Sequence, residues 1–147
     1  MAVVSRAAVV WEGDLMSGKG TVSALGSKAF KDLPVSWASR TEAPNGRTSP
    51  EELVASAHAS CFAMAFSAGL ARNKTPPTRL EVSCAVTFDK TDAGWRIKSS
   101  ALEVKGTVAG LDQAAFDAAA QAAKDGCPIS QALKGNLELS VKATLNR

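Results

Sequence analysis

The stretch that decides the fold is Ser49 to Asn73, SPEELVASAHASCFAMAFSAGLARN. Ser49 is a favoured N-cap residue, Pro50 suits the first helical position, and two glutamates follow in the first turn, where the helix dipole favours negative charge. Almost every later residue is apolar or small, until Pro76 and Pro77 end the pattern. The sequence therefore predicts a helix of about six turns that is apolar nearly all round and so is buried.

The composition is that of one globular domain spanning residues 1–147. Hydrophobic residues make up 46% of the chain, charged residues make up 21%, and the net charge is +3. The lysines and arginines are scattered, and five phenylalanines and three tryptophans are spread thinly among them. Because nucleic-acid-binding proteins gather basic and aromatic side chains on one face, we expect no nucleic-acid partner.

Cysteine content and apolar segments indicate the compartment. Three cysteines are an odd number, which argues against the disulfide framework of a secreted protein. Residues 1–14 lack the apolar core and cleavage site of a signal peptide. The longest apolar stretch, 61–71, is interrupted by Ser67 and is short for a bilayer span. We therefore expect a cytoplasmic protein without a membrane partner, in which an important cysteine is catalytic or metal-bound.

The segment before the helix is predicted to form a small β-sheet. Residues 2–11 are rich in valine, 21–25 form a second candidate strand, and 35–39 form a third. Turn-forming residues at 12–14 and 17–20 separate the first two strands. Such a sheet must pack on an apolar surface, because a small meander is not stable alone.

Beyond Pro77 the hydrophobic period changes from helical to two. Apolar residues alternate with polar or small ones from 80 to 88, which predicts a half-buried strand, and Thr91–Gly94 is a hairpin turn. The remaining elements are expected to be a returning strand at 95–108, an alanine-rich helix at 111–125, a short helix at 127–133 and a last strand at 137–141. This order is α+β, with antiparallel sheets wrapped around the long central helix.

The three cysteines differ in their surroundings. Cys61 lies on a helical stripe, where it is either a small buried hydrophobe or a reactive thiol. That stripe comprises Leu53, Ala57, Cys61, Met64 and Ala68. Cys127, between Gly126 and Pro128, begins a short helix whose free backbone amides favour a thiolate. Cys84 alternates with valines on the core side of a strand, so we expect it to be structural.

His58, the only histidine, shares a helix face with Cys61. Structural zinc sites use four ligands, and this chain falls short of that number, so we predict no metal site and no cofactor. A papain-like pair of His58 and Cys61 is also unfavourable, because the imidazole has no evident orienting partner. We expect His58 to be a packed or interface residue.

Several motifs resemble those of a known family. SPEELVASAHASCFAMAFS, residues 49–67, resembles the helix motif of the OsmC/Ohr family of thiol-dependent peroxidases, in which an acid precedes the reactive cysteine by ten residues. GCPISQAL, residues 126–133, resembles the segment that carries the family's second cysteine. Residues 13–23 and 36–44 resemble its N-terminal sheet and arginine-bearing loop. The resemblance covers nearly the whole chain, and the Ala-His-Ala-Ser-Cys context is closer to the OsmC branch.

The resemblance implies a peroxidase that reduces organic hydroperoxides. Cys61 would attack the peroxide as a thiolate, and Cys127 would resolve the sulfenic acid as a disulfide, which an external thiol or dithiol, such as a lipoyl group, reduces. Phe62 and Met64 would contact the alkyl part of the substrate. The resemblance also implies an OsmC-like fold and an intertwined homodimer with its sites at the subunit interface.

The resemblance further indicates which residues activate Cys61. Burial in an apolar helix raises the pKa of a thiol, so a thiolate there needs a neighbouring cation, and arginine does not lose its charge. Arg40 matches the family's loop. Arg47 is the alternative, although a solvated loop residue is its simpler interpretation. Glu51 would hold the arginine through a bidentate pair, and a helix-start acid is its other interpretation.

Helix geometry separates Glu51 from Cys61. They are about 15 Å apart along the axis and about 80° apart around it, which a glutamate side chain cannot close. Either a long arginine spans much of the gap or the acid comes from another chain. Two such helices packed antiparallel would bring each helix start towards the other's middle. We therefore favour a twofold dimer whose sites draw on both chains.

Two other functions remain open at this point. A redox-responsive binding protein would hold a lipophilic ligand in the same pocket, with little turnover. A structural dimer would contain inert cysteines, and rapid alkylation of Cys61 at neutral pH distinguishes it from the peroxidase.

Overall fold

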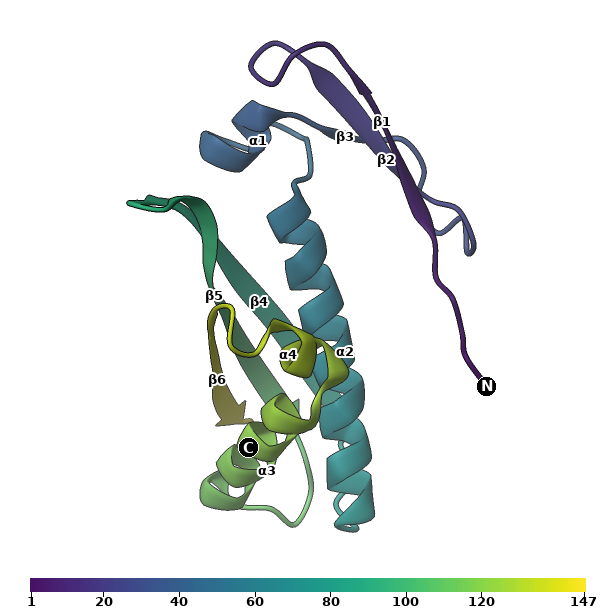
Figure 1. The fold of residues 1–147 in the computed structure, drawn as a ribbon. Coiled ribbons are helices and arrows are strands. Elements are labelled where there is room, and N and C mark those ends of the chain that lie inside the picture. Colours follow the sequence, from purple (N-terminus) through teal and green to yellow (C-terminus); the bar gives the residue numbers. More distant parts are fainter. The chain divides into compact units, whose positions relative to one another are not determined.

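A computed structural model describes all 147 residues and contains the predicted long helix as α2 (Pro50–Arg72) (Figure 1). The Ser49 hydroxyl accepts a hydrogen bond from the backbone N–H of Glu52 at 3.1 Å, which confirms Ser49 as the N-cap. The Glu52 carboxylate accepts a further hydrogen bond from the Thr48 hydroxyl at 2.8 Å. The helix ends just before Lys74, whose φ of 62° breaks the helical geometry.

The chain divides into two compact units, residues 1–53 and 54–147, so the first turn of α2 belongs to one unit and the remainder to the other. The prediction that 1–147 form one domain stays a prediction.

The first unit contains a three-stranded antiparallel sheet in the order β1 (Ala7–Glu12), β2 (Lys19–Ala24), β3 (Leu33–Val35). The first strand starts later than the predicted 2–11, and the third is shorter than predicted. Gly20 on β2 lies against Trp11, since a Cβ there would come within 2.8 Å of the indole ring. The sheet thus depends on a glycine where its two long strands pair.

The prediction of a strand at 35–39 is wrong beyond Val35. Residues Trp37–Thr41 form a short helix, α1. Ser36 and Ser39 form a reciprocal capping box, in which each hydroxyl accepts a hydrogen bond from the other residue's backbone N–H at 3.1 Å. This local capping overrides the β-propensity of Trp37. Arg40, expected in a loop, therefore lies on a helix.

The second unit contains a sheet in the order β4 (Arg79–Thr91), β5 (Gly94–Thr107), β6 (Glu138–Leu145). The predicted hairpin and the alternating burial of β4 are confirmed. β6 pairs with β5 in parallel, so the expectation of purely antiparallel sheets is wrong there. Parallel pairing requires a long crossover, which the two helices between β5 and β6 provide.

These helices are α3 (Gln113–Gly126) and α4 (Pro128–Leu133). Asp112 caps α3 rather than lying inside it, and its carboxylate accepts a hydrogen bond from the Ala115 N–H at 2.8 Å. The side-chain amide of Gln113 bonds the free edge of β6, donating to the Ala143 carbonyl at 3.1 Å and accepting from the Leu145 N–H at 2.8 Å. These side-chain hydrogen bonds therefore satisfy backbone groups of β6 that would otherwise face water.

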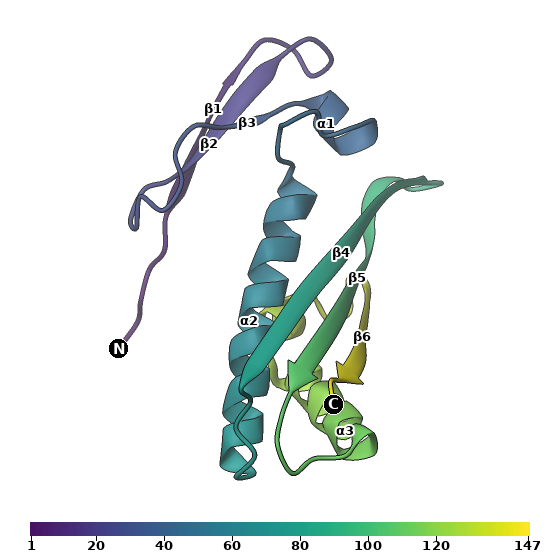
Figure 2. The same ribbon diagram turned by 180° about the vertical axis from the view of Figure 1, so that it is seen from behind.

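In the second unit α2 and α3 cover one face of the sheet (Figure 1, Figure 2). The rings of Phe62, Phe66 and Phe116 pack in series, with centroids 5.4 and 5.0 Å apart. The buried core comprises Phe62, Phe66, Leu70, Leu102, Val104, Val108, Phe116, Ala120, Ala123 and Cys127. Phe62, expected to contact substrate, is fully buried in this core, so that expectation is wrong.

Within one chain α2 is buried on one face only. His58, Phe62, Phe66 and Leu70 are at most 1% exposed, whereas Met64 is 68% exposed. The stripe through Met64 and Ala68 is thus the outer edge of the helix, contrary to the prediction of burial all round. Judged by length and composition alone, α2 is also long and apolar enough to cross a membrane.

Candidate active site

The structure brings Cys61 and Cys127 together. Cys61 lies in the middle of α2, and Cys127 is the N-cap residue of α4, where Pro128 occupies the first turn. The two thiols are close enough for each to shift the pKa of the other, and all three cysteines of the chain are free thiols. Cys127 is fully buried, whereas Cys61 is partly exposed. Neighbouring free thiols of this kind are candidates for a disulfide.

The pKa of Cys127 is lowered from its ordinary value. Burial alone would raise it, but the neighbouring polar groups of Cys61, Ser130 and Ile129 outweigh burial. Cys127 lies at the N-terminus of α4, as the sequence predicted, although its side chain makes no capping hydrogen bond there.

Cys61 has the opposite tendency. Burial raises the pKa of Cys61, and the hydrogen bond to Cys127 raises it further, while the N–H of Ile129 acts in the other direction. This agrees with the expectation that an apolar helix disfavours the thiolate. A thiolate at Cys61 therefore needs a stabilising positive charge.

The first unit contains a preorganised cation. The Arg40 guanidinium donates to both carboxylate oxygens of Glu51, with Nε 3.2 Å from each oxygen and Nη2 2.6 Å from Oε1. Glu51 is 6% exposed, and the Arg40 side chain is 28% exposed. The Arg40 guanidinium also lies 5.5 Å from the centre of the Trp37 ring. The bidentate pair predicted from the sequence is present, whereas Arg47 is exposed.

An apolar pocket of about 330 Å³ lies beside Arg40 in the first unit. Its walls are lined by Val9, Trp11, Leu15, Val22, Val35, Ser36, Trp37, Arg40, Pro50 and Leu53. A hydrocarbon group fits such walls, and the guanidinium supplies the one charged donor. This lining could not be predicted from the sequence, because its residues come from strands, turns and two helices.

His58 and its neighbours form a buried row of hydrogen-bonded side chains, which the sequence patterns did not predict. His58 is fully buried, with Nδ1 2.6 Å from the Ser100 Oγ and Nε2 2.7 Å from the Ser130 Oγ. Burial lowers the pKa of His58. The expectation of a packed histidine is confirmed, but its hydroxyl partners lie 42 and 72 residues away, beyond the reach of local patterns.

Cys84 lies at the far end of the same row of hydrogen-bonded side chains. Its Sγ is 3.1 Å from the Ser100 Oγ and 3.9 Å from His58 Nδ1. Burial raises the pKa of Cys84, and the bond with Ser100 only partly offsets this. The prediction that Cys84 lies on the core side of its strand is confirmed, and its purely structural role stays a prediction.

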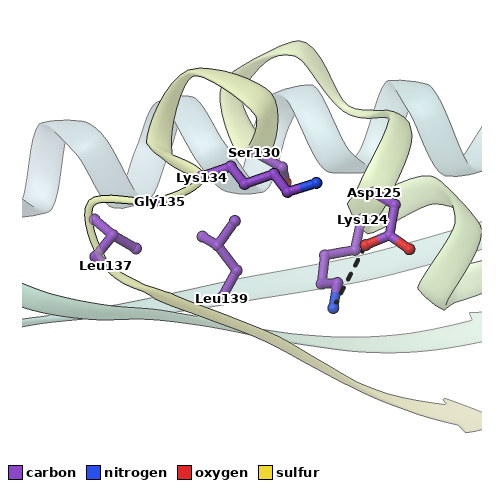
Figure 3. A pocket seen from close by; sticks show the side chains of 7 residues that line it. All are labelled: Lys124, Asp125, Ser130, Lys134, Gly135, Leu137 and Leu139. Atoms are coloured by element: carbon purple, nitrogen blue, oxygen red, sulfur yellow. Dashed lines mark ion pairs between the residues drawn. The ribbon is translucent and has the colours of Figure 1, made fainter.

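Ser130 also lines a small cavity of about 220 Å³ (Figure 3). Two lysines and an aspartate border it, with Lys124 Nζ 3.7 Å from Asp125 Oδ1. The second lysine is Lys134, and the other lining residues are Gly135, Leu137 and Leu139. The serine that hydrogen-bonds His58 thus also borders this cavity.

Comparisons with known proteins agree with this arrangement. The sequence model of OsmC-like proteins matches residues 43–142. The chain is 41% identical to Peroxiredoxin OsmC of Escherichia coli (strain K12) over 139 residues, which are 95% of this chain and 96% of that protein. It is 29% identical over 99 residues to Organic hydroperoxide resistance protein-like 2 of Staphylococcus epidermidis (strain ATCC 12228 / FDA PCI 1200), covering 66% of this chain and 68% of that protein.

Solved structures show the same fold. The organic hydroperoxide resistance protein OsmC of Legionella pneumophila aligns with a TM-score of 0.71 at 20% identity, covering 97% of this chain and 99% of that chain. OhrB of Bacillus subtilis aligns with a TM-score of 0.68 at 22% identity, covering 96% and 98%. Close kinship with a peroxiredoxin indicates an enzyme with a peroxide-related redox role. The chain belongs to the OsmC-like family.

Proposed function

We propose that the protein reduces organic hydroperoxides to alcohols, with Cys61 as the peroxide-reactive thiol and Cys127 as the resolving thiol. The observation that carries this proposal is the proximity of these two thiols, one of them at a helix N-terminus. The names of the relatives, peroxiredoxin and organic hydroperoxide resistance protein, support the same substrate class.

The chemistry balances in three steps. The Cys61 thiolate attacks one peroxide oxygen, so that an S–O bond forms, the O–O bond breaks, and the alkoxide leaves as an alcohol after taking up a proton. Cys127 then attacks the sulfenic sulfur, which forms the disulfide and releases water. An external dithiol reduces this disulfide and is itself oxidised to a disulfide. Rapid resolution protects the sulfenic acid from further oxidation.

Arg40 and Glu51 supply the activating charge in this proposal. A guanidinium held by two hydrogen bonds is preorganised and retains its charge, so it favours the thiolate of Cys61 and the developing negative charge on the peroxide. The apolar pocket beside Arg40 suits an alkyl substituent, which is the reason to propose organic peroxides rather than hydrogen peroxide. A cytoplasmic location, where thiol reductants are available, belongs to the same proposal.

We further propose that the protein acts as a homodimer. A single chain leaves large apolar side chains exposed, including Val9 at 58%, Val10 at 65% and Met64 at 68%. Exposed apolar surface of this kind marks an interaction site in a folded protein. A second copy of the chain would cover β1 and the outer edge of α2.

Intact-mass measurement after adding one equivalent of cumene hydroperoxide tests the function. We expect the wild-type chain to lose two hydrogens and to regain them on treatment with a dithiol. Cys61→Ser should show no change in mass, and Cys127→Ser should gain one oxygen and then more in excess peroxide. Cys84→Ser is the matched control and should behave like the wild type. Unchanged peroxide turnover by Cys61→Ser would contradict the proposal.

A further inference from the structure

The small cavity of about 220 Å³ in the second unit has no part in the proposed cycle, because neither Cys61 nor Cys127 lines it. It lies between the last turn of α3, α4 and the start of β6 (Figure 3). Its lining combines two lysines and one aspartate with two leucines. The cavity therefore offers a ligand both charged groups and apolar surface.

The loop between α4 and β6, which borders the cavity, is fixed by its own backbone hydrogen bonds. The Lys134 N–H donates to the Ser130 carbonyl at 2.9 Å, and the Asn136 N–H donates to the Leu133 carbonyl at 3.1 Å. Gly135 has a φ of 85°, which residues with a side chain rarely adopt. This side of the cavity is thus formed before any ligand binds, which reduces the entropy that binding costs.

The lysines of the cavity lack a close counter-charge. The Lys124 side chain is 18% exposed, and the one carboxylate within 4 Å of its ammonium group is that of Asp125, at 3.7 Å. Asp125 is itself 76% exposed, so solvent screens this pair. No carboxylate lies within 4 Å of the Lys134 ammonium group. A lysine largely withdrawn from water without a hydrogen-bonded carboxylate favours the binding of an anion.

The charge and the apolar surface of the lining indicate which anion fits. Two lysines and one aspartate leave an excess of one positive charge, which matches a monoanion, and the aspartate repels an anion of higher charge. Leu137 lies at the opposite end of the cavity from Asp125 (Figure 3). An apolar cavity of about 150 Å³ holds benzene, so this larger one has room for a ring that carries a carboxylate.

We propose that this cavity binds small organic carboxylates, with the carboxylate paired with the ammonium groups of Lys124 and Lys134 and the apolar body against Leu137 and Leu139. Lysine suits this role, because its ammonium group has three donors on a flexible stem and can adjust to a small anion. The inference goes beyond the proposed function and is independent of it, since no residue of the proposed cycle lines the cavity.

An NMR titration of the full-length, nitrogen-15-labelled protein with benzoate tests the site. We expect saturable shifts in the backbone amide signals of residues 124–139, with a dissociation constant of about 1 mM for a ligand of this size. Separate signals are needed because benzoate also fits the apolar pocket beside Arg40, where it would shift the signals of α1. Benzyl alcohol has the ring without the charge, and acetate has the charge without the ring. Each should bind at 124–139 at least about tenfold more weakly than benzoate.

Substitution of the two lysines tests their role. Lys124→Gln and Lys134→Gln each remove one positive charge and keep a polar side chain. Each should weaken the binding of benzoate at residues 124–139 by about fivefold or more. Lys142→Gln is the matched control, because Lys142 is exposed on β6, lies outside the cavity and loses the same charge. This control should bind benzoate like the wild type.

Several results would overturn the inference. They are the absence of saturable shifts at residues 124–139, equal affinities for benzoate and benzyl alcohol, and an equal loss of affinity in Lys142→Gln. Tighter binding of inorganic phosphate than of benzoate would also overturn it, because the site would then not select a carboxylate. Lys134 is exposed, so Lys134→Gln keeps the test decisive if Lys124→Gln is unstable. Failure of the proposed function is seen separately, as a missing disulfide after one equivalent of cumene hydroperoxide.

Discussion

At the scale of single residues, His58 makes stability depend on pH in a defined direction. Its pKa in the folded chain is below the ordinary value of 6.5. As the pH falls through 6.5, the unfolded chain takes up a proton that the folded chain does not. The free energy of unfolding should therefore decrease on acidification below 6.5, by at most about 1.4 kcal/mol per pH unit, and His58 should have no such effect above it.

Urea unfolding at pH 7.5 and pH 5.5 measures this effect. His58 is the only histidine, so little else in the chain titrates between these values. His58→Gln should lower the stability at both values and abolish most of the difference between them. If His58→Gln shows the same difference in the free energy of unfolding between the two pH values as the wild type, the pH dependence arises from another group.

Gly106 illustrates a different constraint on a single residue. A Cβ at this position on β5 would come within 2.5 Å of the Phe116 ring and 3.0 Å of Leu80 Cδ2. Gly106→Ala should therefore lower the free energy of unfolding by about 1–3 kcal/mol through overpacking. Gly126→Ala is the control, since a Cβ there meets no atom within 4 Å, and urea unfolding should show little change or a small gain.

At the scale of elements, the sequence predicted what depends on neighbours along the chain. The caps and composition of α2 and the alternation and turn of the hairpin are local, and these elements were predicted nearly to their ends. α1 was missed because it is a five-residue helix that a pair of serines maintains. The parallel pairing of β6 was missed because it depends on a crossover rather than on any local pattern.

The same distinction holds for the site. Cys61, Cys127, Arg40 and Glu51 were named because family motifs carry them, and the structure brings them together in two pairs. The partners of His58 could not be predicted, because they come from β5 and α4 and lie in no common motif. Serine is also too common in sequences for its presence to predict hydrogen bonds with a particular histidine.

The capping box of α1 allows a prediction for the element that carries Arg40. Ser36→Ala removes the acceptor for the Ser39 N–H and should destabilise the helix by about 1 kcal/mol. Because α1 positions Arg40 against Glu51, the proposed reaction of Cys61 with cumene hydroperoxide should slow several-fold. Ser60→Ala is the control, as that exposed hydroxyl bonds only carbonyls of its own helix. Equal reaction rates in Ser36→Ala and Ser60→Ala would show that the stability of α1 does not affect catalysis.

At the scale of the whole molecule, complementation between subunits tests the proposed dimer. Glu51→Ala and Cys61→Ser should each be nearly inactive. If Glu51 and its arginine serve the cysteine of the other chain, heterodimers of the two variants contain one intact site and should recover up to about half of the wild-type activity. The heterodimer is isolated with two affinity tags, and its peroxide consumption is measured. A verified heterodimer without activity would show that each chain serves its own cysteine.

The glutamines of α3 also affect how the chain behaves in a crowded solution. An open strand edge is a template on which other chains can add strands one after another, and such growth produces fibrils. Along β6, the side chains of Gln113 and Gln121 hydrogen-bond backbone groups of Val141, Ala143 and Leu145. These groups are therefore not available to pair with an added strand. Polymerisation from this side first requires α3 to detach, which makes β4 the more accessible starting edge for aggregation.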